Sequence, residues 1–138
     1  MLKKLLSRLA LAATIAFPCA YSAYAAELGD TPQTSDERGI KVNVLLQYIP
    51  AEAKTWDFEV TLESHTQALN DDLTKSAVLI ADGTKYLPLG WEGSPPGGHH
   101  RKGLLRFKVV APRPQSVELQ IRLAGEKAPR TFSWALQK

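Results

Sequence analysis

Residues 55–63, TWDFEVTLE, alternate strictly between apolar and polar side chains. Every second side chain of an extended chain points to the same side, so the apolar members of this stretch share one face. Those members are Trp56, Phe58, Val60 and Leu62. A period of two residues is typical of a strand with one buried face. The stretch therefore predicts a β-strand whose apolar face lies in the core.

The same alternation recurs in three other stretches, residues 42–48, 117–123 and 132–136. Residues 76–89, SAVLIADGTKYLPL, predict two short strands around Asp82-Gly83, a dipeptide favoured in tight hairpins. Two segments, residues 50–56 and 70–76, have room for a helical turn but not for a core helix. About seven short strands separated by turns predict an all-β protein, an antiparallel β-sandwich of immunoglobulin-like type.

Residues 1–25 have the features of a cleaved export signal. Three basic residues come first, an apolar run follows over residues 9–17, and Ala-Tyr-Ala at 23–25 supplies small residues at the cleavage point. The apolar run is shorter than the roughly 20 residues that a membrane-spanning helix needs. We therefore expect cleavage after Ala25, a periplasmic or secreted protein, and no stable membrane anchor.

The composition of the remaining chain narrows its class. Without residues 1–25 the chain has 14 Lys and Arg against 14 Asp and Glu. A formally neutral protein lacks the basic excess that neutralises phosphates, so no nucleic-acid partner is expected. The removed segment also contains Cys19, the single cysteine, so no disulfide can form in the mature chain. Cys19 follows Phe-Pro instead of small residues, which disfavours a lipoprotein.

The expected domain organisation is simple. Residues 26–38, AELGDTPQTSDER, are polar without an apolar period and predict a flexible leader. Residues 39–138 are then expected to form a single β-sandwich domain, which is a normal size for one hydrophobic core. The sequence shows no internal repeat and does not indicate the oligomeric state.

Two adjacent histidines, His99 and His100, lie in LGWEGSPPGGHHRKG, residues 89–103. Neutral imidazole is the commonest protein ligand for zinc or copper, so the pair raises the question of a metal site. Neighbouring side chains of an extended chain point to opposite faces. The two rings can therefore share one ion only if the backbone turns, which Gly97 and Gly98 permit.

The third histidine, His65, follows the 55–63 strand and precedes Asp71 and Asp72. We expect this connection and the 89–103 loop to meet at one pole, where His65, the adjacent histidine pair and one carboxylate supply ligands suited to Zn²⁺ or Cu²⁺. The alternative is structural: the histidines hydrogen-bond loop carbonyls, and the aspartates cap a turn. A blue-copper centre is excluded because it needs a Cys thiolate.

A second hypothesis treats the same loop as a protein-interaction surface with structural histidines. Trp91 and Pro95-Pro96 are rigid and apolar, and Arg101 and Lys102 add positive charge. Exposed Trp and Arg are favoured anchors at interfaces. An unidentified protein partner is then expected at this loop.

Enzymatic signatures are absent from the sequence. It contains no G-x-S-x-G elbow, phosphate loop or H-E-x-x-H motif. Ser64 and His65 are adjacent, which is poor geometry for a base acting on its neighbour's hydroxyl within one strand. The sequence therefore favours an exported binding or accessory domain that is not an enzyme.

Three strings resemble a family of small exported bacterial and archaeal domains: WDFEVTLESHTQALNDDL, YLPLGWEGSPPGGHHRKGLLRF and RTFSW. The resemblance covers roughly residues 40–135 and centres on a W-x-G-x-P-P-G-G-H-H-R signature. The matching positions are His65, Asp71, Asp72, Trp91, Gly93, Pro95, Pro96, Gly97, Gly98, His99, His100 and Arg101. The resemblance implies the sandwich fold and these signature positions, and it implies no particular activity.

Overall fold

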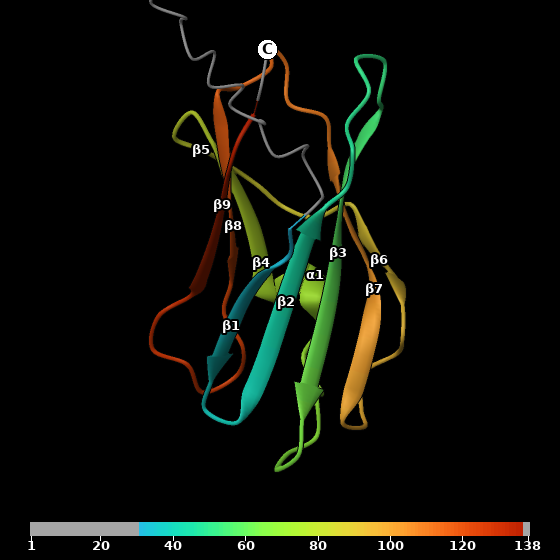
Figure 1. Cartoon of the computed structure of the whole chain (residues 1–138), viewed down its shortest axis with the longest axis vertical. Coiled ribbons are helices and arrows are strands. Elements are labelled where there is room, and N and C mark those ends of the chain that lie inside the picture. The colour runs from blue at the N-terminus through green and yellow to red at the C-terminus, as the bar shows by residue number, and fades with distance from the viewer. Residues whose placement is uncertain (1–30, 137–138) are drawn as a thin grey trace, which may run out of the picture.

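The computed structural model describes residues 31–136. Two antiparallel sheets pack face to face, which confirms the predicted all-β sandwich (Figure 1). The predicted signal peptide, Cys19 and the first part of the predicted leader lie outside the described residues. Within residues 31–136, no helix has the length and apolar character to cross a membrane.

One sheet has five strands in the order β1-β2-β3-β7-β6. They are β1 (Gln33–Glu37), β2 (Ile40–Leu46), β3 (Thr55–Ser64), β7 (His100–Lys108) and β6 (Gly90–Gly93). The other sheet has four strands in the order β5-β4-β8-β9. They are β5 (Thr84–Tyr86), β4 (Ala77–Ala81), β8 (Ser116–Ile121) and β9 (Arg130–Ala135), and a short helix α1 (Leu73–Ser76) precedes β4. The described chain thus has nine strands instead of about seven, and β1 and β6 are the two additional ones.

The core lies between the sheets and follows the predicted alternation. All four apolar side chains of residues 55–63 are buried. The Phe58 ring meets Phe107 edge-on at 5.6 Å between centroids, and it lies 5.3 Å from the Trp134 ring of the opposite sheet. Tyr48 differs from the prediction, because β2 ends at Leu46 and the tyrosine side chain is exposed.

Two-residue turns close two hairpins. Asp82-Gly83 joins β4 to β5 as predicted, with φ values of 49° and 76°. Arg38-Gly39 joins β1 to β2 with φ values of 54° and 77°. Positive φ at both positions is the geometry that matches the twist of paired strands and favours glycine at the second position.

The predicted flexible leader is wrong for residues 33–37, which form β1 and pair with β2 from Gln33↔Val44 to Glu37↔Ile40. The side chains of β1 are half-buried or exposed, so the sequence shows no apolar period there. The Gln33 side-chain amide exchanges hydrogen bonds with the main chain of Ser133 and so links β1 to the edge of the other sheet. Contacts with residues far along the chain therefore order this strand.

Candidate functional site

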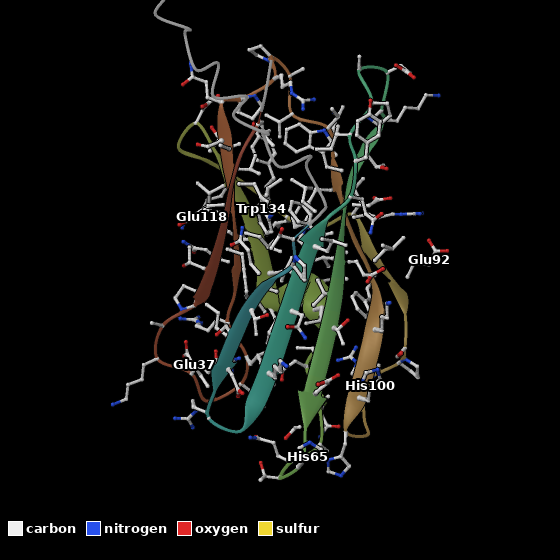
Figure 2. The ribbon with its side chains drawn as sticks, in the orientation of Figure 1. Glu37, His65, Glu92, His100, Glu118 and Trp134 are labelled. Carbon is white, nitrogen blue, oxygen red and sulfur yellow. The ribbon has the colours of Figure 1, made fainter. Side chains whose placement is uncertain are left out.

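The predicted meeting of two loops at one pole is confirmed. We call it the histidine pole; it comprises the connection 64–72 and the turn 94–100. Ser64 N–H donates to the His99 carbonyl at 2.9 Å, and Leu69 N–H donates to the Gly98 carbonyl at 2.9 Å. Gly97 N–H returns a bond to the Leu69 carbonyl at 2.7 Å. His65 and His100 accordingly lie at the same end of the sandwich (Figure 2).

The three imidazoles have different surroundings. His99 Nδ1 donates to the Ser64 carbonyl at 3.1 Å and so reinforces the ladder between the two loops. His100 Nδ1 lies 3.5 Å from Glu63 Oε1, and both side chains are exposed on the outside of the five-stranded sheet. His65 is exposed beyond the end of β3, beside a surface hollow.

The two aspartates are also committed to local structure. Asp71 Oδ1 accepts from Ala124 N–H at 2.8 Å, which ties the connection 64–72 to the chain after β8. Asp72 is the N-cap of α1, and its Oδ1 accepts from the Thr74 hydroxyl at 2.6 Å and from Thr74 N–H at 3.0 Å. These hydrogen bonds, the hydroxyl first, lower the pKa of Asp72 because they stabilise its charged form.

The structure does not bring the predicted ligands together. Among residues 31–136, no group of three or more His, Cys, Asp or Glu side chains is placed to hold a metal ion. The predicted zinc or copper set comprised His65, His99, His100, Asp71 and Asp72. The physical reason is that a loop carbonyl, a strand neighbour, a main-chain amide and a helix cap hold four of these side chains in separate places, and that His65 is exposed beyond the end of β3.

Arg101 is predicted to be part of an exposed partner surface, and the structure corrects this. The side chain is 1% exposed, because it lies on the same inward face of β7 as Leu105 and Phe107. Nη1 donates to the Asp71 carbonyl at 2.7 Å and to the Leu69 carbonyl at 3.4 Å. Nη2 donates to the Ser94 carbonyl at 3.4 Å. Arg101 thus fastens both loops of the histidine pole from inside.

Trp91 covers the Arg101 guanidinium, whose central carbon lies 5.6 Å from the ring centroid. The indole Nε1 donates to the Ser94 carbonyl at 2.8 Å. Gly103 makes room for this ring, since a Cβ there would lie 2.7 Å from Trp91 Cζ2. No described carboxylate forms an ion pair with Arg101, and burial lowers the pKa of its guanidinium, opposed by Asp71 and Asp72. The indole face and carbonyl oxygens therefore replace a counter-ion.

The solvent-facing side of Trp91 and its neighbouring residues is apolar. Pro95 and Pro96 are exposed, and Leu89 is 64% exposed beside Trp91. A shallow hollow of about 240 Å³ is lined by Leu89, Gly90, Trp91, Glu92 and Arg106. Lys102 is exposed as predicted, and its Nζ pairs with Glu59 Oε1 at 3.0 Å on the outer face of the sheet.

A second buried arginine, Arg130, was not singled out by the sequence pattern. Its Nε and Nη2 donate to Glu126 Oε1 at 2.9 and 2.6 Å, and the two side chains are 1% and 5% exposed. Nη1 donates to the Ile40 carbonyl at 2.7 Å, and Nη2 to the Glu37 carbonyl at 2.9 Å. One signal could have found it: Arg130 is in phase with the inward residues Phe132 and Trp134.

Comparisons with known proteins add one structural similarity. No family model matches the chain, and no curated protein matches it. A solved structure of YcdA, a candidate lipoprotein from Bacillus subtilis, is similar with 19% sequence identity and a TM-score of 0.49. The match covers 77% of this chain and 38% of that chain. Similarity at this level carries no functional assignment.

Proposed function

We propose that this chain is an exported, non-enzymatic binding domain that contacts a protein partner beside the histidine pole. The contact surface is the Trp91 surface, which runs along β6 from Leu89 through Trp91 to Pro95 and Pro96 at the pole; Leu89 lies at the other end of β6, where its N–H donates to the Arg106 carbonyl. The observation that carries the proposal is that exposed Pro95 and Pro96 lie in a loop whose backbone is held by several hydrogen bonds, and that exposed Leu89 extends the apolar surface at the other end of β6. The hydrogen bond of the His99 ring to a loop carbonyl supports a structural role for that histidine, and no three ligands within residues 31–136 converge on an ion.

The loop is pre-organised by its hydrogen bonds. The ladder to residues 64–69 holds its far end, and the Ser94 hydroxyl accepts from Lys102 N–H at 3.2 Å at its near end. Arg101 and the Trp91 indole both donate to the Ser94 carbonyl from beneath. A surface that is already ordered loses little conformational entropy on binding, which favours affinity.

The Trp91 surface also has the composition of an interface centre. Leu89 and the half-buried Trp91 supply apolar area, and the two prolines add area without rotamer entropy. A polar rim adjoins it, where Arg106 Nη1 pairs with Glu92 Oε2 at 2.8 Å. Glu92 points away from the β6 edge (Figure 2). An apolar centre beside charged groups is the usual anatomy of a binding patch.

Site-specific photo-crosslinking in the producing cell tests the proposal. A benzophenone amino acid is placed at position 89 or 96, and at position 48 as a matched control. Tyr48 is also an exposed large side chain, and it follows β2, which β3 and β7 separate from β6 in the five-stranded sheet. We expect the same discrete adduct from positions 89 and 96 and none from position 48. Adducts of equal yield from all three positions, or none from 89 and 96, would reject the Trp91 surface.

The export part of the proposal has its own test. If Ala-Tyr-Ala at 23–25 is the cleavage motif, the intact mass of the purified protein corresponds to a chain beginning at Ala26. A mass that fits an acylated Cys19 as the first residue would replace the secreted chain with a lipid-anchored one.

A further inference from the structure

A second surface, separate from the Trp91 surface, lies on the outside of the four-stranded sheet. A groove of about 770 Å³ opens there between α1, the end of β5 and the turn that follows β8. Its lining includes three cations from three different elements: Lys75 on α1, Lys85 on β5 and Arg122 just after β8. All three side chains are exposed.

The fold brings these cations to one groove. Arg122 N–H donates to the Ser76 carbonyl at 2.9 Å, which places the end of β8 directly beside the end of α1. Lys85 lies opposite Ile80 in the pairing of β4 with β5, at the edge of the same sheet. Each position is therefore set by backbone pairing and not by an ion pair of its own side chain.

The described carboxylates that line the groove do not pair with its three cations. Asp71 and Glu126 also line it, but each carboxylate already has partners. Glu126 binds the buried Arg130, and Asp71 accepts from Ala124 N–H and is the acidic group that most favours the charged form of the buried Arg101. No ion pair within residues 31–136 involves Lys75, Lys85 or Arg122.

The groove also has an apolar component. Leu87 lines it and is 73% exposed, and Val78 lies half-buried along its floor. Two lysine ammonium groups and one arginine guanidinium, mounted on three different elements, are separate charges, and such a set suits several spaced carboxylates better than one compact anion. We propose that this groove binds an acidic, extended segment of a partner protein, with Leu87 against an apolar side chain between its carboxylates.

The test uses purified protein and a fluorescein-labelled decapeptide, Glu-Glu-Leu-Glu-Glu repeated twice, measured by fluorescence anisotropy. A second peptide has glutamine at every glutamate position. We expect binding of the acidic peptide alone, weakened about tenfold when salt shortens the screening length from about 30 to about 8 Å. The double variant Lys85→Glu, Arg122→Glu should lose at least about tenfold in affinity, and Leu87→Ser about threefold.

The matched control is the double variant Lys41→Glu, Lys108→Glu. It makes the same charge change at exposed positions of the five-stranded sheet. We expect it to retain binding, and melting curves establish that both double variants are folded. The variant Leu89→Ser, which alters the Trp91 surface, should also bind the acidic peptide normally, so failure of one surface is distinguishable from failure of the other.

Several outcomes would overturn the groove proposal. They are absence of acidic-peptide binding at about 1 mM, equal binding of the glutamine peptide, and equal loss in the control double variant. Binding to phosphatidylglycerol vesicles without binding to the acidic peptide would also overturn it and would identify the groove as a lipid-headgroup surface.

Discussion

Arg130 and Arg101 are both buried at the histidine-pole end of the sandwich, but on different sheets and with different partners. Arg130 binds a buried carboxylate, Glu126, and carbonyls of the β1–β2 hairpin. Arg101 binds only carbonyls and lies under an indole ring. The first arginine has a charge pair with Glu126 in the β8–β9 connection and reaches the other sheet through carbonyls, and the second fastens two loops through neutral groups alone.

This difference matters because a buried charged group destabilises the folded protein most when its partner is removed. Loss of Arg130 leaves a carboxylate buried without its cation. Loss of Arg101 leaves neutral carbonyls, two of which keep another donor: Leu69 accepts from Gly97 N–H, and Ser94 accepts from Trp91 Nε1. Equal burial therefore does not mean equal contribution to the free energy of unfolding.

The largest effect is expected for Arg130→Met. It strands Glu126 in the interior and removes donors from the Ile40 and Glu37 carbonyls, so the free energy of unfolding should fall by about 3–5 kcal/mol. Urea denaturation measures it. In the double variant with Glu126→Leu the loss should be smaller than in Arg130→Met alone, because the stranded charge is gone. A single-variant loss below about 1 kcal/mol would mean that the pair behaves as a surface salt bridge.

The second effect is for Arg101→Met, with an expected loss of about 1–3 kcal/mol. The Asp71 carbonyl loses the donor that lies 2.7 Å away, while removal of the desolvated charge offsets part of the cost. Burial lowers the pKa of Arg101, because desolvation disfavours the charged guanidinium in the folded protein. Methionine carries no charge and therefore removes this desolvation cost. Urea denaturation beside Arg130→Met gives the comparison directly. A loss as large as that of Arg130→Met would show that the two arginines contribute equally to stability despite their different partners.

A smaller effect is expected for Trp91→Phe, which keeps a ring above Arg101 and removes the Nε1 donor to the Ser94 carbonyl. The loss should be about 1 kcal/mol or less, because Arg101 still donates to the same oxygen. In the Arg101→Met background the same substitution should cost more. A double-mutant cycle with additive losses would show that the two donors do not share the carbonyl.

The smallest effect is expected for Asp72→Asn at the cap of α1. The pKa of Asp72 is lowered in the folded state, chiefly by the Thr74 hydroxyl, so its stabilisation is present above its unfolded pKa of about 3.9. It is lost as pH falls through the lower folded value. Melting temperatures of parent and variant should therefore differ at pH 7 and converge in strong acid. A difference that persists unchanged in acid would exclude the carboxylate charge as its cause.

The sequence by itself determined which side chains of the strands face the core. Alternation in residues 55–63 and 117–123 predicted buried faces that the structure contains, and Asp82-Gly83 predicted the β4–β5 turn. These are local features, since strand period and turn conformation depend on neighbouring residues. The meeting of the connection 64–72 with the turn 94–100 was also predictable, because both lie at ends of strands that pair.

The tertiary structure alone decided which polar groups are buried and what they bind. Arg101 contacts carbonyls about thirty positions away in the chain, and Arg130 contacts carbonyls about ninety positions away. β1 is likewise ordered by partners distant in sequence, Ser133 among them. The histidines remained apart because backbone hydrogen bonds between the two loops set the place of each residue. The residue type alone does not specify the distances between the imidazole rings. A strand pattern specifies a direction for each side chain; only the packed sheets specify the atom that it meets.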